Sequence, residues 1–194
     1  MKHATSRLLF AYWDSLRGDR SAPERSQIEP GRIRHILADT FILAQETDGR
    51  PVFRLAGTRV NALFARDLKD VGFCDLWPAD RRTEAEGLVD IVCGDAVGAV
   101  AGLVAETGSG EAVALELLLL PLRHLGTTNR RMIGALSPGS VPSWLGLSPV
   151  EALDMRSLRI VGGRPQPEAG FAELGPAAAA KRHRFVVLDG GLAP

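Results

Sequence analysis

Two charged residues stand inside otherwise apolar segments of the sequence. Glu116 interrupts the apolar run 112–122, and Arg54 lies between Phe53 and Leu55. An unpaired carboxylate is costly in a protein core, so a buried Glu116 would need a partner such as an arginine. Arg54 is a candidate partner, and its planar guanidinium could also bind an anionic ligand through two hydrogen bonds. We therefore take Arg54 and Glu116 as candidate ligand-binding residues; the alternative is that both face solvent or a dimer partner.

The other reactive residue types form no pattern of enzyme or metal chemistry. The sequence has no Gly-x-Ser-x-Gly motif, no phosphate-binding loop and no Gly-x-Gly-x-x-Gly motif after a strand. Its two cysteines are too few for a disulfide scaffold or a cysteine-rich zinc site. No two of its histidines have metal-ligand spacing; they are His3, His35, His124 and His183. We expect no catalytic residues, no enzymatic activity and no metal site.

Length and composition are those of a globular protein, with 194 residues of which 45% are hydrophobic. The length suits one domain with an extension. The 23 basic and 23 acidic residues cancel, whereas a nucleic-acid-binding domain normally carries a basic excess. The apolar runs are too short to span a bilayer, and charged residues interrupt any secretory signal. We expect a cytoplasmic protein without a membrane span or a nucleic-acid partner.

The hydrophobic pattern predicts five strands in the middle of the chain, with three helical segments between the second and third strands, of which the middle one is one or two broken turns within residues 66–77. Strands 40–46 and 52–56 are joined by an Asp-Gly turn, and strands 97–106, 112–122 and 131–136 by short loops. Between the two groups, Thr58 can cap a short helix and Asp80 an amphipathic helix that ends near Cys93. Because hairpins make neighbouring strands antiparallel, the predicted fold class is α+β, a five-stranded antiparallel sheet with helices on one face.

An amphipathic helix is also predicted near the amino terminus, capped by Thr5 or Ser6 and ended by Gly18. Its apolar stripe consists of Leu8, Leu9, Tyr12, Trp13 and Leu16. Two large aromatic side chains on so short a helix need a surface to cover, either on their own domain or on a second copy of the chain. We predict that this stripe forms a homodimer interface.

The chain divides into three predicted parts. Residues 1–35 form the amino-terminal helix and a linker, residues 36–140 the core, and residues 141–194 a partly flexible, proline-containing extension. Two short apolar pieces of the extension, 158–161 and 185–188, could each add a strand or dock on the core.

Several segments, in this order, resemble a known family. They are YWDSLRGDRSAPERSQIEP, ILADTFIL, FRLAGTRV, LKDVGFCDLW, ELLLLPLRHLG and MIGALSP. Together they are similar to the small alphaproteobacterial PAS-like family, from about Leu8 to Pro138. The resemblance implies a PAS fold and a sensory or signalling role that often involves dimerisation. The sequence from Val141 onward lies outside it.

PAS domains bind ligands between the sheet and the middle helices, so the resemblance allows two cofactor classes to be tested. Flavin photoreceptors of this fold carry an Asn-Cys-Arg-Phe-Leu-Gln motif, but Cys74 stands in Gly-Phe-Cys-Asp-Leu without those partners. Haem-binding members need an axial ligand on the long helix, and residues 80–93 contain no histidine, methionine or tyrosine. Flavin and haem are therefore disfavoured, and no cofactor is predicted; an unidentified small ligand stays open.

The leading hypothesis is a cytoplasmic PAS-type sensory or signalling module. The 54 residues after Ser140 are too few for a kinase or cyclase, so we expect it to act in trans, through contacts with an unidentified signalling protein. One alternative is a structural adaptor with a filled core and no ligand. Another is a small cone-fold enzyme, which would need an acid–base residue in a deep apolar pocket.

Overall fold

A computed structural model of the chain describes residues 1–125 and 127–162. Its fold is α+β, as predicted, but the antiparallel sheet has six strands rather than five, in the order β2-β1-β5-β4-β3-β6. The strands are β1 (Thr40–Gln45), β2 (Pro51–Ala56), β3 (Gly98–Thr107), β4 (Ala112–His124), β5 (Thr127–Pro138) and β6 (Val150–Val161). The helices are α1 (Ala4–Arg17), α2 (Thr58–Leu63) and α3 (Arg82–Gly94).

The five predicted strands are present within a few residues of their expected bounds. Each of the pairs β1–β2, β3–β4 and β4–β5 is an antiparallel hairpin, and β1 also pairs with β5, which joins the two groups. Strand β4 pairs with β3 on one side and with β5 on the other, and its continuous apolar run lies in the middle of the sheet with both faces covered over much of its length.

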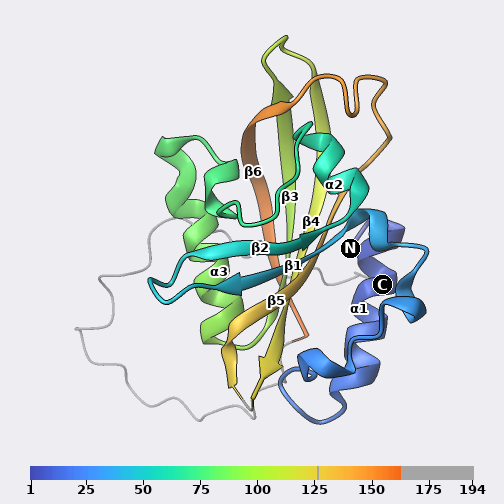
Figure 1. The fold of residues 1–194 in the computed structure, drawn as a ribbon, viewed down its shortest axis with the longest axis vertical. Coiled ribbons are helices and arrows are strands. Elements are labelled where there is room, and N and C mark those ends of the chain that lie inside the picture. Colours follow the sequence, from blue (N-terminus) through green and yellow to red (C-terminus); the bar gives the residue numbers. More distant parts are fainter. Residues whose placement is uncertain (126, 163–194) are drawn as a thin grey trace, which may run out of the picture.

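Alternation along β4 separates two hydrophobic clusters, one on each face of the sheet. Leu115, Leu117 and Leu119 belong to the cluster that also contains the buried residues of α2 and α3. Leu118 and Leu120 belong to the second cluster, with α1 and the segment that follows it. We call the α2/α3 side the inner face and the α1 side the outer face. Helices therefore cover both faces, as Figure 1 shows, so the prediction of helices on one face was incomplete.

Helix α1 packs on its own sheet. Leu9 and Trp13 are fully buried, and the Trp13 indole N–H donates to the Pro121 carbonyl at 2.7 Å. These two members of the predicted dimer stripe are unavailable to a partner, because their side chains fill the outer-face cluster. Leu8 is the exposed member, at 46%, while Tyr12 and Leu16 are half-buried.

The ends of the helices differ in part from their predicted caps. His3 caps α1, because its Nδ1 accepts the Thr5 backbone N–H at 3.2 Å, whereas Thr5 and Ser6 lie buried inside the helix. Gly18 ends α1 as expected, with a φ of 55°. Gly57 rather than Thr58 precedes α2, and a short 3₁₀ turn that contains Asp80 precedes α3, which begins at Arg82.

The sixth strand lies in the part of the chain predicted as an extension. β6 pairs with β3 along its whole length, from the contact of Thr107 with Val150 to that of Gly98 with Val161. The core sheet thus continues past residue 140, and the predicted piece 158–161 is the end of this strand. The other predicted piece, 185–188, lies outside the described residues.

Candidate functional site

Arg54 lies on β2 and is half-exposed. Its guanidinium pairs with Glu46 at the end of the β1–β2 hairpin and with Asp70 at 2.8 Å. Both carboxylates are themselves exposed, so this is a surface ion-pair network with little effect on stability. The structure therefore does not bring Arg54 to Glu116, which lies on β4 among different partners.

Glu116 lies on the outer face of the sheet, the face that Leu118 and Leu120 share. Its carboxylate accepts the backbone N–H groups of Lys2 at 2.6 Å and of His3 at 3.0 Å. The partner of this carboxylate is thus the chain segment that enters α1, not an arginine. This contact fastens the start of α1 to the middle of the sheet, more than a hundred residues away in sequence.

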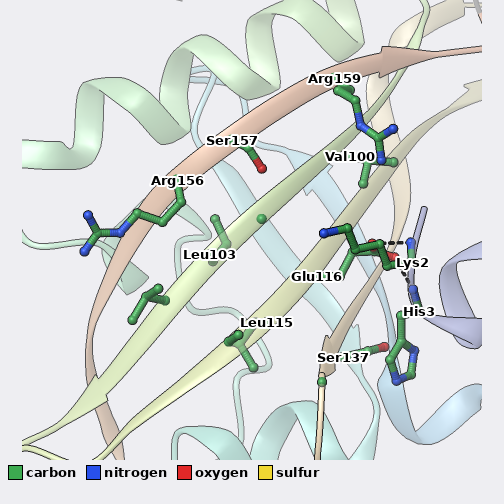
Figure 2. A pocket seen from close by; sticks show the side chains of 14 residues that line it. Lys2, His3, Val100, Leu103, Leu115, Glu116, Ser137, Arg156, Ser157 and Arg159 are labelled. Atoms are coloured by element: carbon green, nitrogen blue, oxygen red, sulfur yellow. Dashed lines mark hydrogen bonds between the residues drawn. The ribbon is translucent and has the colours of Figure 1, made fainter. Parts of the chain in front are cut away.

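A groove of about 440 Å³ opens beside Glu116 on the outer face, where α1 does not cover β3 and β4. Figure 2 shows it from close by. The floor is formed by β3 and β4, one wall by Lys2 and His3, and the other wall by β6. The lining residues are Lys2, His3, Val100, Gly102, Leu103, Val104, Ala114, Leu115, Glu116, Ser137, Gly139, Arg156, Ser157 and Arg159.

Gly102 gives the groove its depth. A Cβ at this position would lie 2.7 Å from the Ser157 hydroxyl oxygen, so any side chain here would fill the space between the walls. Val104 and Ala114 beside it are small and apolar. The floor is therefore a strip of sheet that an apolar group can contact directly.

Most residues of this groove were not predicted as functional. Lys2 and His3 precede the first regular element, where periodicity carries no signal. Ser157 and Arg159 do show a sequence signal, because they alternate with Leu158 and Ile160 at the end of an apolar piece. That alternation indicates a strand with one polar face, but nothing in it shows which other residues that face meets.

Comparison with known proteins agrees with this architecture. The family model described as PAS domain matches residues 1–137, about seven tenths of the chain. The chain belongs to the PAS domain family. No curated protein matches it in sequence. PAS domains are generally sensory or interaction modules, so the predicted family and general role are supported.

The interior of this PAS domain, between the sheet and the helices of the inner face, is densely packed in the region of its aromatic side chains. Phe41, Phe53, Phe73 and Trp77 are each at most 2% exposed, and their rings pack in a chain of contacts with centroids 5.1–6.1 Å apart. These contacts lie between the sheet and the helices of the inner face, the region in which the family resemblance implied a ligand. The groove at Glu116 lies on the opposite face.

Both cysteines of the PAS domain are buried free thiols. Burial, with Glu86 and Asp75 nearby, raises the pKa of Cys74 to about 12, and burial raises the pKa of Cys93 to about 11. A thiol with so high a pKa is a poor nucleophile at neutral pH. Cys74 therefore acts as an apolar core residue.

The described residues contain no helix long and apolar enough to cross a membrane. They also contain no group of three or more His, Cys, Asp or Glu side chains placed to hold a metal ion.

The contact of Glu116 with the chain entering α1 should make stability depend on pH. Burial raises the pKa of Glu116, but the Lys2 backbone N–H, the Ser6 hydroxyl, the His3 backbone N–H and the N-terminal ammonium together outweigh it and hold the pKa below its ordinary value of 4.5. A lowered folded-state pKa means that this stabilisation is present above pH 4.5 and is lost as the pH falls through the folded-state pKa. Glu116→Gln should lower the free energy of unfolding at neutral pH by about 0.5–1 kcal/mol.

Urea unfolding at neutral and at acid pH measures this difference. The gap between wild type and Glu116→Gln should close once the pH is well below the Glu116 pKa. Glu84→Gln, on α3, is the control and should show little effect at either pH. A gap that persists in acid would contradict the assigned role of the carboxylate.

Proposed function

We propose that this PAS domain is a cytoplasmic sensory or signalling module that acts in trans through protein–protein contacts. One observation carries the proposal: the Glu116 carboxylate joins the outer-face groove to the chain entering α1. A molecule that enters the groove meets Lys2 and His3 directly. Its binding energy can therefore shift the position or order of the amino-terminal end of α1.

Helix α1 is suited to carry such a change to a partner because its two ends are held differently. Its carboxyl-terminal half is anchored by Trp13, which is fully buried. Its amino-terminal end is held by polar contacts: the Lys2 and His3 backbone N–H groups donate to Glu116, and the Thr5 hydroxyl donates to Asp39 at 3.3 Å. A change in the groove therefore affects the amino-terminal end first, and Leu8 lies on the exposed side of that end.

The partner surface that we propose is the exposed side of α1, centred on Leu8, and the partner is a second copy of the chain. This keeps the predicted homodimer but changes its contact residues, because Leu9 and Trp13 belong to the chain's own core. A Trp13→Glu variant would consequently unfold the domain rather than separate two copies of it.

Sedimentation velocity of wild type and Leu8→Glu tests the proposal. Wild type should sediment as a dimer at tens of micromolar, and Leu8→Glu as a monomer with an unchanged circular dichroism spectrum. Leu55→Glu is the matched control, since Leu55 is an equally exposed leucine, at 51%, on β2. This variant should stay dimeric. A monomeric wild type, or a dimeric Leu8→Glu, would rule out the α1 contact.

A second function, a structural adaptor that binds no small molecule, is favoured by the packed aromatic interior of the inner face. It shares the partner surface on α1 with the sensory proposal. The two functions differ only in whether the groove binds a ligand.

A further inference from the structure

The groove beside Glu116 combines an apolar floor with positively charged walls. Val100, Val104 and Ala114 supply apolar surface at the floor, and Gly102 leaves it open. Lys2 and Arg159 rise from opposite walls. An apolar surface bounded by cations is suited to a molecule that has an apolar body and an anionic end.

The positive charges of the walls are only partly neutralised within the groove. Arg156 is paired with Asp154 at 2.6 Å, but neither Arg159 nor the Lys2 ammonium has an ion-pair partner within residues 1–125 and 127–162. The one carboxylate of the lining, Glu116, carries a single negative charge, and the N-terminal ammonium, a further cation, also interacts with it. At least one positive charge is therefore left without a counter-charge.

Polar groups at one end of the groove are arranged around the same space. In Figure 2 the Arg159 guanidinium lies beside Val100, and the Lys2 side chain extends over Glu116 toward β3. The Ser157 hydroxyl, from the same strand as Arg159, lies next to Gly102, 2.7 Å from where a Cβ on that residue would be. An anion at this end could accept hydrogen bonds from a guanidinium, an ammonium and a hydroxyl, while its body lies along the floor toward Val104 and Ala114.

We propose that the groove binds a small amphipathic carboxylate, a molecule with a linear or compact apolar body and one carboxylate head. The head lies between Arg159 and Lys2, because a planar guanidinium matches a carboxylate in two parallel hydrogen bonds. The volume of about 440 Å³ is in the range of small-molecule sites. This inference rests on the sensory function proposed above and names the class of molecule that is sensed.

Isothermal titration calorimetry of the full chain with three probes tests the ligand class. Octanoate carries both features, octan-1-ol has the same chain without the charge, and acetate has the charge without the chain. Octanoate should bind at least about tenfold more tightly than either of the others, since the charge-assisted hydrogen bonds and the apolar contact act together.

Two variants locate the site. Arg159→Gln should weaken octanoate about tenfold and leave octan-1-ol unchanged, and Arg54→Gln is the matched control because it removes an exposed arginine from the other edge of the sheet. Gly102→Val should weaken octanoate by filling the floor. Because the Gly102→Val substitution could affect folding, the melting temperature of this variant is measured without ligand. Arg159→Gln changes an exposed residue and is the independent test.

Equal octanoate affinity in wild type and Arg159→Gln would overturn the proposal, as would equal binding of octanoate and octan-1-ol. The outcome is separable from that of the sensory function. If octanoate binds at Arg159 without altering the sedimentation of the dimer, the binding site is confirmed but its signalling role is ruled out. If the dimer depends on Leu8 but binds no carboxylate, only the proposed ligand site is ruled out, and the adaptor function is favoured.

Discussion

Trp13→Ala should lower the free energy of unfolding by about 3–5 kcal/mol, the cost of deleting a large buried aromatic side chain. Trp13 is fully buried between α1 and the sheet, and its ring contacts Phe10, with centroids 5.9 Å apart, and the Arg17 guanidinium at 5.1 Å. The substitution also leaves the Pro121 carbonyl without the indole donor. Chemical denaturation followed by far-ultraviolet circular dichroism measures the loss.

Leu8→Ala is the control for Trp13→Ala, because it lies on the same helix but is exposed. Its effect should stay within about 0.5 kcal/mol under conditions where the chain is monomeric. A loss below 1 kcal/mol for Trp13→Ala would mean that α1 is not part of the folded core. The outer-face hydrophobic cluster would then be assigned wrongly, and so would the groove wall that the chain entering α1 forms.

Gly57→Ala is expected to destabilise the domain by about 1–3 kcal/mol or more, the range of overpacked sites. A Cβ on Gly57 would lie well under 3.0 Å from the carbonyl oxygens of Leu37 and Ala38, so backbone rather than a flexible side chain would have to move. The position joins β2 to α2. Beside it, Arg59 of α2 pairs at 2.5 Å with the buried Asp39, which also accepts a hydrogen bond from Thr5 of α1.

Thermal unfolding of Gly57→Ala and of Gly31→Ala provides the comparison. Gly31 also has an ordinary backbone conformation, but a Cβ there meets nothing within 4 Å, so its replacement should be neutral or slightly stabilising. Equal melting temperatures for the two variants would show that the chain around residues 37, 38 and 57 is looser than the structure has it.

The sheet is the part of the fold that local pattern predicts well. Apolar runs of strand length, separated by Asp-Gly and Gly-Ser-Gly turns, are local features, and a hairpin needs no distant information to pair. The strands of β1–β2, β3–β4 and β5 were therefore found close to their true bounds. The strand β6 was only partly found, because its first half, from Val150 to Met155, mixes charged and apolar residues without strict alternation, and bulges interrupt its pairing with β3.

The site was beyond such local reasoning. Glu116 was singled out because a carboxylate in an apolar strand is anomalous, yet the suggested partner, Arg54, pairs with Glu46 and Asp70 instead. The groups that do meet Glu116 are backbone N–H groups, which every residue has and which no sequence pattern marks. Arg159 reaches the groove only because β6 returns to the edge of the sheet beside β3.

The sequence by itself thus determined five of the six strands and the antiparallel pairing of neighbouring strands, since each follows from the order and period of nearby side chains. The tertiary structure decided that α1 covers its own sheet, that the chain entering α1 fastens to β4, and that a groove is left open next to both. These outcomes depend on which distant apolar surfaces bury each other most completely. The burial of these surfaces depends on the whole chain, so it cannot be predicted from a short segment of sequence.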